Sequence, residues 1–413
     1  MGSWLRLSTR LLGAGLGTGV SLGISGFVLP LVEAADVEAA DVEMTPSEPS
    51  PTAPAPTRMP LRPVPPGEDD EIWVELALPS DRPALLQAIQ HSLTYLATPK
   101  AATDYQDYPI PGITRDRVWR SLQRLRQLIT HSPDDQALRS ALGREFVLYE
   151  SIGADGEGTV AYTGYFEPQY RASAVPTAEY RYPLYRRPPT LESWPQPHPT
   201  RLELEGSDGL SSGQGPLAGL ELVWLASRLE AFLVQVQGSA KLELTDGSVM
   251  SVGYAGRTEY PYTSIGRALV NDGKIASDDL SLPNLLAYFE ANPEALDHYL
   301  PLNERFIFFR EGGSGPPTGS LSVPVTAGYS IATDKSLLPP GAIAAIQLPL
   351  PHQTAQGSWA NRPITRLVLD QDTGGAIIGP GRVDLFIGSG AAAGELAGRI
   401  NTPGRLYYLL LRP

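Results

Sequence analysis

The chain has 413 residues, 42% of them hydrophobic, which is enough to bury one or two ordinary cores. Its net charge is −13, with 32 basic and 45 acidic residues and no Lys/Arg run, which argues against nucleic-acid binding. The absence of cysteine excludes disulfides, thiolate catalysis, cysteine-based zinc sites and a lipoprotein anchor on an N-terminal cysteine. The five histidines are scattered singly, so we expect neither a metal site nor a cofactor.

The N-terminal region is typical of an exported protein. Arg6 and Arg10 precede an apolar run over residues 11–32, and Val32-Glu33-Ala34 fits a signal cleavage site. The run is also long enough to cross a bilayer, so residues 1–35 predict either a signal peptide or a retained anchor. We therefore expect the rest of the chain in the periplasm or cell envelope, soluble or anchored at its N-terminus. Residues 36–71, acidic and then rich in proline, predict a disordered linker.

Residues 72–167 predict the first part of a main domain. Apolar residues at helical spacing predict helices over 83–95 and 116–129, and Ser132 and Pro133 signal the start of another over 134–142. The pattern then changes to β, with an aromatic-rich strand over 160–168.

Residues 168–253 predict an inserted, all-β domain, which we interpret as a small barrel or sheet. Strands are expected over 180–185, 220–225 and 231–236. The segment 241–252 alternates around Asp246-Gly247, a strong hairpin signal.

Residues 254–413 predict the second part of the main domain. Helices are expected over 264–271 and 284–300, followed by strands over 305–309, 342–348, 364–369, 382–387 and 406–411. A main domain interrupted by an insert would place a cleft where the two meet, and ligands commonly bind in such clefts.

One Gly-rich stretch carries two candidate catalytic carboxylates. Four glycines and a proline separate the strands predicted over 364–369 and 383–387, so the backbone there can turn tightly and approach a ligand. Asp372 opens this turn and Asp384 closes it. Carboxylates at strand ends often serve catalysis, but aspartate also commonly caps turns, and this stretch alone leaves both interpretations open.

Seven motifs occur in the order found in the membrane-bound lytic murein transglycosylase A family, which the chain resembles over residues 75–413. They are Thr163-Gly164-Tyr165-Phe166-Glu167-Pro168, Tyr182-Pro183-Leu184-Tyr185-Arg186-Arg187-Pro188, Val236-Gln237-Gly238-Ser239, Gly253-Tyr254-Ala255-Gly256, Pro261-Tyr262-Thr263-Ser264-Ile265-Gly266, Asp334-Lys335-Ser336-Leu337-Leu338-Pro339-Pro340-Gly341 and the Gly-rich stretch from Asp372 to Gly390. The last two resemble that family's three-aspartate module, with its aspartates at Asp334, Asp372 and Asp384. The chain departs from the family pattern at Ala240, where glycine is usual, and at Thr258-Glu259, where Asn-Gly is usual.

The resemblance implies a mainly β fold with helices: a discontinuous double-psi β-barrel main domain, an inserted smaller β-barrel, and a glycan groove between them. The implied reaction cleaves the β-1,4 bond between N-acetylmuramic acid and N-acetylglucosamine of peptidoglycan and leaves a 1,6-anhydro sugar. Asp384 would be the single general acid and base, supported by Asp372. Substrate-binding positions would be Thr163, Tyr165, Gln237, Ser239, Gly388 and Gly390. Peptidoglycan glycan strands are the expected partner, with cell-wall synthesis proteins as further partners of a monomer.

Two other classes of function remain open from the residues. Asp372-Thr373-Gly374 matches the aspartic-protease triplet, but that mechanism needs two such aspartates sharing a proton, and the chain has one. The other alternative is a barrel that binds glycan without cutting it.

Overall fold

The computed structural model describes residues 59–77, 81–106, 108–211, 213, 215–313 and 315–413. The predicted export segment and the linker up to residue 58 lie outside these ranges. None of the helices described in them is long and apolar enough to cross a membrane.

The larger of the two sheets closes into a six-stranded barrel. Its strands, in order around the barrel, are β15 (Asn401–Leu411), β12 (Ile343–Gln353), β13 (Trp359–Asp372), β11 (Ser330–Ala332), β14 (Arg382–Ser389) and β4 (Val160–Glu167), which pairs back with β15. Two of the pairings, β4 with β14 and β11 with β13, are parallel. The strands come from two distant parts of the chain, and the predicted mainly β fold with a double-psi barrel is confirmed.

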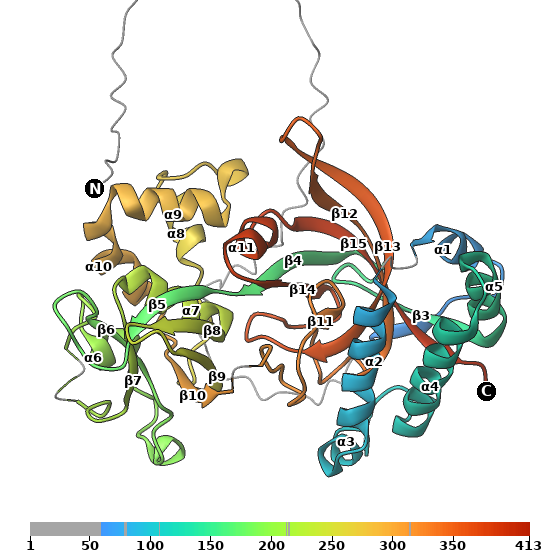
Figure 1. The fold of residues 1–413 in the computed structure, drawn as a ribbon, viewed down its shortest axis with the longest axis horizontal. Helices are drawn as coiled ribbons and strands as arrows, with labels where there is room; N and C mark the ends of the chain where they lie inside the picture. Colours follow the sequence, from blue (N-terminus) through green and yellow to red (C-terminus); the bar gives the residue numbers. More distant parts are fainter. Residues whose placement is uncertain (1–58, 78–80, 107, 212, 214, 314) are drawn as a thin grey trace, which may run out of the picture. The chain divides into compact units, whose positions relative to one another are not determined.

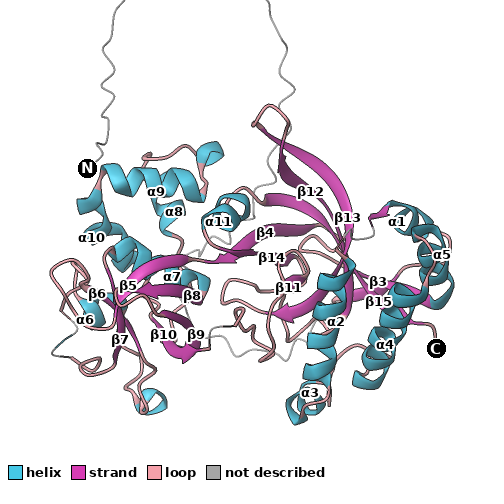
Figure 2. Ribbon diagram, viewed as in Figure 1, coloured by secondary structure: helices cyan, strands magenta, loops and turns pink. Residues whose placement is uncertain are grey.

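Short strands extend this barrel's sheet, and five helices pack on one side of it (Figure 1). The strands β1 (Leu61–Pro63), β3 (Phe146–Ser151) and β2 (Leu76–Ala77) extend the same sheet. The helices are α1 (Asp70–Glu75), α2 (Arg82–Leu96), α3 (Pro99–Asp104), α4 (Arg115–His131) and α5 (Asp135–Glu145), and they lie together near β3 and β15 (Figures 1 and 2). Leu85 of α2 and Leu122 of α4 are fully buried in the barrel core, as their helical spacing predicts.

The second sheet has six strands and curls until its edges meet. Their order is β10 (Ile307–Gly312), β9 (Val249–Arg257), β8 (Ser239–Leu244), β5 (Gln169–Ser173), β7 (Glu221–Leu225) and β6 (Tyr182–Tyr185). A bridge between Arg186 and Phe309 links the two edges. The predicted hairpin around Asp246-Gly247 joins β8 to β9. Because β5 starts two residues after β4 ends, a single strand-to-strand step carries the chain from the barrel into this second sheet (Figure 1).

The strand predicted over 231–236 is wrong, because these residues belong to helix α7 (Arg228–Gln237). Ser227 caps its first turn by accepting a hydrogen bond from the Glu230 amide, and Gly238 ends it with a left-handed φ of 78°. Serine before a helix and glycine after it are strong boundary signals. They outweigh the β-branched residues of the short run, which is also too short for its periodicity to decide between helix and strand.

Three predicted boundaries also need correction. The linker expected to reach residue 71 ends earlier, since β1 pairs with β3 and α1 begins at Asp70. The insert expected to end at 253 continues through β9 and takes its last strand, β10, from residues 307–312. The helix expected over 284–300 is divided at Asn292-Pro293 into α9 (Leu282–Ala291), a 3-10 turn and α10 (Leu296–Tyr299), because proline cannot continue the hydrogen-bond ladder of α9.

The helices beside the second sheet pack against one another through a separate apolar cluster. This cluster combines residues of α7, α8 (Ile265–Asn271), α9 and α10. The remaining short elements are α6 (Arg201–Glu205), α11 (Ala391–Ala397) and the 3-10 helices Leu191–Ser193, Ser277–Asp279 and Leu300–Leu302.

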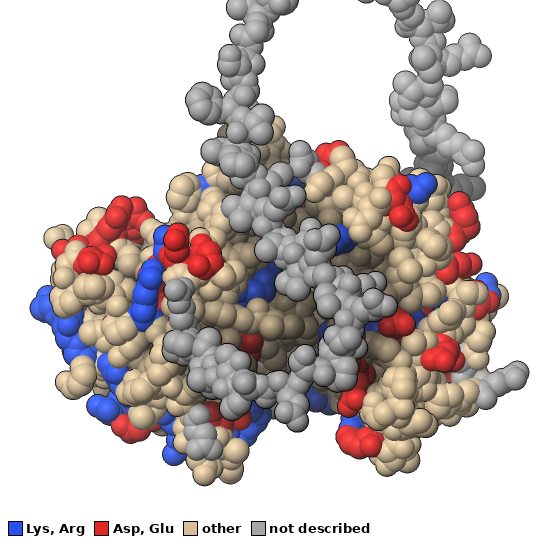
Figure 3. Space-filling view, turned by 180° about the vertical axis from the view of Figure 1, so that it is seen from behind, with Lys and Arg blue, Asp and Glu red and all other residues tan. Residues whose placement is uncertain are grey.

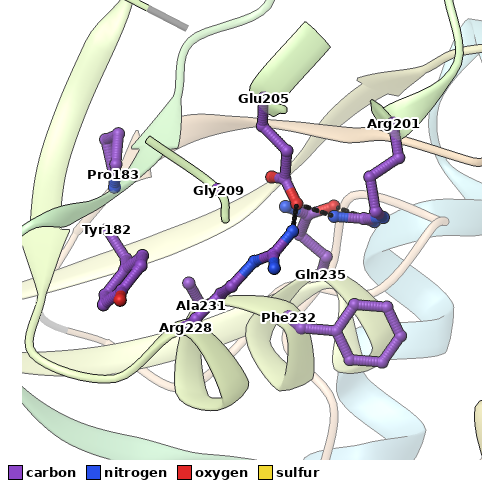
Figure 4. A pocket seen from close by; sticks show the side chains of 9 residues that line it. All are labelled: Tyr182, Pro183, Arg201, Glu205, Gly209, Arg228, Ala231, Phe232 and Gln235. Atoms are coloured by element: carbon purple, nitrogen blue, oxygen red, sulfur yellow. Dashed lines mark hydrogen bonds and ion pairs between the residues drawn. The ribbon is translucent and has the colours of Figure 1, made fainter. Parts of the chain in front are cut away.

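A buried arginine holds α6, α7 and the segment before β10 together (Figure 4). The Arg201 side chain is 1% exposed and lies between the rings of Phe232 and Phe306, 5.0 and 5.1 Å from their centroids. Its guanidinium donates to the Gln235 side chain at 2.7 Å and to the Arg305 carbonyl at 2.7 Å. The backbone at Arg305 is therefore fixed from inside the insert.

Both signs of charge occur on the face of the molecule turned away from the view of Figure 1. On the face shown in Figure 3, Lys and Arg are interspersed with Asp and Glu.

We expect Gly381→Ala to lower the free energy of unfolding by about 2 kcal/mol, the usual range for overpacking. Gly381 directly precedes β14, and a Cβ placed there would overlap the backbone of Ala154. Urea unfolding measures the change. Gly313→Ala, at a glycine with nothing within 4 Å of an added Cβ, is the control for the effect of alanine on the unfolded chain. An equal loss in both variants would contradict the packing argument.

Candidate active site

Asp384 lies on β14 directly opposite Thr163 on β4. Its neighbours Val383 and Leu385 are fully buried in the barrel core, so strand alternation turns Asp384 toward the other face. There Asp384 accepts a hydrogen bond from the Thr163 hydroxyl, and 21% of its side chain remains exposed. Burial raises the pKa of Asp384, partly opposed by the charge of Arg382 and the Thr163 hydrogen bond. The result is an accessible carboxyl that is biased toward its protonated form.

Arg382 is a member of this cluster that the sequence analysis did not single out. Its Nη2 donates to the Thr163 hydroxyl at 2.9 Å and lies 3.4 Å from Asp384 Oδ1. The hydroxyl thus connects the guanidinium to the carboxyl. Arg382 could have been identified from the sequence, because residues two apart on a strand share a face, which places Arg382 beside Asp384.

Asp372, at the end of β13, is occupied by three hydrogen bonds. It accepts from the Tyr165 hydroxyl, the Ser320 amide and the Thr373 amide, each at 2.8 Å. Burial raises the pKa of Asp372, against the effect of these hydrogen bonds, and its charge in turn raises the pKa of Asp384. Asp372 is therefore placed as an electrostatic neighbour of Asp384.

Tyr165 lies two residues after Thr163 on β4 and points to the same side. Its hydroxyl donates to Asp372 and its ring packs against Phe386 at 5.1 Å. The structure thus assigns Tyr165 contacts within the protein, whereas the adjacent Phe166 is buried.

Asp334, the first aspartate of the three, joins two loops. It accepts from the Ser336 amide at 3.0 Å and the Ser336 hydroxyl at 2.6 Å, and its other oxygen accepts from the Gly379 amide at 2.8 Å. Burial by itself would raise the pKa of Asp334, but these hydrogen bonds outweigh it and the pKa is lowered. Asp334 thus holds the Gly-rich loop that separates the other two aspartates.

The other predicted substrate-binding residues gather where β4 leaves the barrel. Gln237 accepts from the Phe166 amide at 3.2 Å, and Ser239 begins β8 opposite Gly253. Gly388 and Gly390 have φ of 129° and 83° at the turn from β14 into α11, and the Gly390 amide donates to the Glu167 carbonyl at 2.8 Å. The predicted catalytic aspartates and the predicted substrate-binding residues therefore lie along the same strand, β4.

The chain is similar to known proteins in sequence and in fold. The chain matches the family models of the MltA specific insert domain over residues 161–310 and of the 3D domain over residues 329–410. It is 33% identical over 267 residues to membrane-bound lytic murein transglycosylase A of Escherichia coli K12, covering 64% of this chain and 69% of the relative. The Vibrio cholerae protein of that name is 33% identical over 259 residues, covering 62% and 67%.

Two solved structures are similar over most of their length. A membrane-bound lytic murein transglycosylase from Agrobacterium tumefaciens is 29% identical with a TM-score of 0.64, covering 82% of this chain and 94% of that chain. Escherichia coli MltA with bound chitohexaose is 26% identical with a TM-score of 0.65, covering 82% and 92%. The identity to the curated relatives, the two domain matches and the shared fold together show that the chain belongs to the membrane-bound lytic murein transglycosylase A family.

Proposed function

We propose that the protein is a peptidoglycan lytic transglycosylase that cleaves the β-1,4 bond between N-acetylmuramic acid and N-acetylglucosamine with one carboxyl group, Asp384. The main support is the contrast between the two aspartates. Burial raises the pKa of both, but Asp384 accepts a hydrogen bond from Thr163 and keeps 21% of its side chain exposed, whereas three hydrogen bonds occupy Asp372 within the protein. Hydrolytic glycosidases ordinarily need two functional carboxyl groups, but a transglycosylase whose substrate supplies the nucleophile needs one.

The reaction needs two proton transfers, and the Asp384 carboxyl group takes part in both. Protonated Asp384 gives its proton to the glycosidic oxygen as the C1–O bond breaks, which leaves positive charge at C1 of the muramic acid. The resulting carboxylate then takes the proton of the 6-hydroxyl as O6 bonds to C1, so the 1,6-anhydro ring forms and Asp384 is protonated again. No water is consumed, and the intramolecular nucleophile supplies much of the rate advantage.

The neighbouring residues have supporting roles in this proposal. Thr163 orients the Asp384 carboxyl through its hydroxyl, and Asp372 favours the protonated form by its charge. A bound glycan would continue along β4, and the residues that border it there are Gln237, Ser239, Gly388 and Gly390. Binding of chitohexaose to the Escherichia coli relative supports a glycan ligand. The protein would then act in the cell envelope, where its substrate is.

The two alternatives make different products. The protease alternative requires Asp372 to share a proton with a second aspartate, but its oxygens accept from Tyr165, Ser320 and Thr373. Mass spectrometry of murein digested by the protein separates all three. Anhydro-muropeptides support the proposal, and reducing ends, peptide fragments or unchanged sacculi contradict it in favour of a hydrolase, a protease or a binding protein.

The pH profile tests the role of Arg382. A general acid must hold its proton, so the rate should fall as the pH rises through the pKa of Asp384. The charge of Arg382 lowers that pKa, and Arg382→Gln should therefore move this alkaline limb of kcat/KM to higher pH. Arg382→Lys keeps the charge and should leave the limb near its original position. A limb that does not move in Arg382→Gln would assign the ionisation to another group.

A further inference from the structure

Arg305 is a buried residue whose guanidinium has no carboxylate partner in the part of the chain that the structure describes. The residue is 7% exposed, and among the described residues no Asp or Glu oxygen lies within the 4.0 Å that defines an ion pair. Its Nε donates to the Tyr260 carbonyl at 2.8 Å. Its two terminal nitrogens have no hydrogen-bond partner in the described residues, and neither is sealed from solvent. Buried arginine is nearly always paired, so this side chain has capacity for an anion.

A second arginine approaches the same carbonyl oxygen. Arg257, exposed at the end of β9, donates to the Tyr260 carbonyl at 3.4 Å and also has no ion pair within the described residues. Burial lowers the pKa of Arg305, and the charge of Arg257 lowers it further. Two neighbouring cations without a counterion are unfavourable by themselves, in a chain whose net charge is −13. The negative charge of a bound carboxylate would offset both the desolvation cost of Arg305 and the repulsion between the two arginines.

Arg305 of this arginine pair lies beside the candidate active site. Arg305 Nη1 occupies the space that a Cβ at Gly375 would need, and Gly375 lies in the loop between Asp372 and Arg382. The hydroxyl of Tyr262 is close enough to both Arg305 and Arg382 for each charge to affect its pKa. This glycine therefore permits an arginine of the insert to reach the loop that carries the catalytic strand.

The backbone of Arg305 is fixed before any ligand binds, and the hydrogen bond from its Nε to the Tyr260 carbonyl holds the side chain. Its carbonyl accepts from the fully buried Arg201 at 2.7 Å, and Arg201 also donates to the Asn303 carbonyl at 2.9 Å (Figure 4 shows Arg201 and its side-chain partners). A cation held in place by the fold loses little entropy on binding an anion.

We propose that Arg305 and Arg257 form a carboxylate site next to Asp384, so that this protein selects glycan strands that carry carboxylates over neutral glycan. This inference rests on the proposed transglycosylase function and specifies its substrate class. The carboxylate has two sources in murein: the lactyl group of muramic acid in peptide-free strands, and the stem peptide in substituted strands. Both present the planar, bidentate partner that suits arginine.

The test compares binding and cleavage of three glycans. These are peptide-free murein strands, the same strands with their lactyl carboxylates converted to methylamides, and peptide-bearing strands. Arg305→Gln should weaken binding about 10-fold, as expected for a hydrogen-bonded charge, for a carboxylate glycan but not for the methylamide glycan. Arg257→Gln, at an exposed position that tolerates substitution, should weaken the same binding about 3-fold. Arg171→Gln, an exposed β5 residue without an ion pair in the described residues, is the matched control and should bind as the wild type does.

The outcomes separate the sources and the hypotheses. A loss on peptide-free strands supports the lactyl carboxylate, and a loss confined to peptide-bearing strands supports the stem peptide. The carboxylate site is overturned if the wild type binds all three glycans equally, or if neither arginine variant loses affinity for a carboxylate-bearing glycan. Either result leaves the proposed reaction intact. Carboxylate-dependent binding by a wild type that forms no anhydro product would support the site and contradict the proposed reaction.

Discussion

Replacing Asp384 by asparagine should lower the rate of glycan cleavage by about 1,000-fold, within the range that a general acid and base contributes. Asparagine keeps the shape of the side chain and can still accept the Thr163 hydrogen bond, but it cannot donate a proton to the glycosidic oxygen or take one from the 6-hydroxyl. The release of anhydro-muropeptides from purified murein, followed by mass spectrometry, measures the loss.

The same variant should remain folded. A carboxyl whose pKa is raised in the folded state costs stability at pH 7, so the neutral asparagine should unfold at the same urea concentration or a slightly higher one. Asp116→Asn, at a side chain that is 74% exposed on α4, is the control and should keep full activity. Substantial anhydro product from a folded Asp384→Asn protein would remove the single-carboxyl mechanism.

Replacing Lys335 by methionine should lower the free energy of unfolding by about 3–5 kcal/mol, the usual cost of leaving a buried charge without its partner. Lys335, next to Asp334, forms an ion pair with Asp370, whose side chain is 0% exposed. Asp370 also accepts from the Tyr408 hydroxyl at 2.6 Å and from the Thr333 hydroxyl at 2.8 Å, so it joins three strands or loops of the barrel beneath the candidate site. Urea unfolding at pH 7 measures the change.

The loss should depend on pH. Burial raises the pKa of Asp370, and without Lys335 the main opposing effect is gone. A carboxyl with a raised pKa costs nothing below its unfolded value of about 3.9, where both states hold the proton, and costs most above its folded value. The difference between variant and wild type should therefore shrink as the pH falls toward 4. Arg120→Met, which breaks a pair exposed by 55% and 74%, should cost less than about 1 kcal/mol, and an equal loss in both variants would contradict a special role for burial.

Much of the architecture could be predicted because local patterns agreed with the tertiary packing. The apolar spacing of 116–129 appears as α4, and the strands expected over 364–369 and 383–387 lie within β13 and β14. The failures occurred where two local signals competed or where the outcome depended on pairing between distant strands. In α7 the caps Ser227 and Gly238 prevailed over β-branched residues, and the length of the insert depended on β10 pairing with β9 across some fifty residues.

The candidate site, too, could be predicted from the sequence only in part. The Gly-rich stretch, the two aspartates and the motif around Thr163 could all be identified from the chain, because residue types and order carry that information. Their separate roles could not, since they depend on contacts between distant segments. Thr163 meets Asp384 across 221 positions, and Tyr165 meets Asp372 across 207.

The sequence by itself determined the absence of cysteine chemistry, the acidic charge, all of the barrel's strands except β11, and the carboxylates available for catalysis. Only the tertiary structure decided which of the two carboxylates Asp372 and Asp384, whose pKa values are both raised, is occupied by three hydrogen bonds within the protein. It also decided that Arg305 of the insert packs against Gly375 of the Gly-rich loop. The physical reason is that burial, charge proximity and hydrogen bonding act through space, and the chain folds these groups together from segments far apart in sequence.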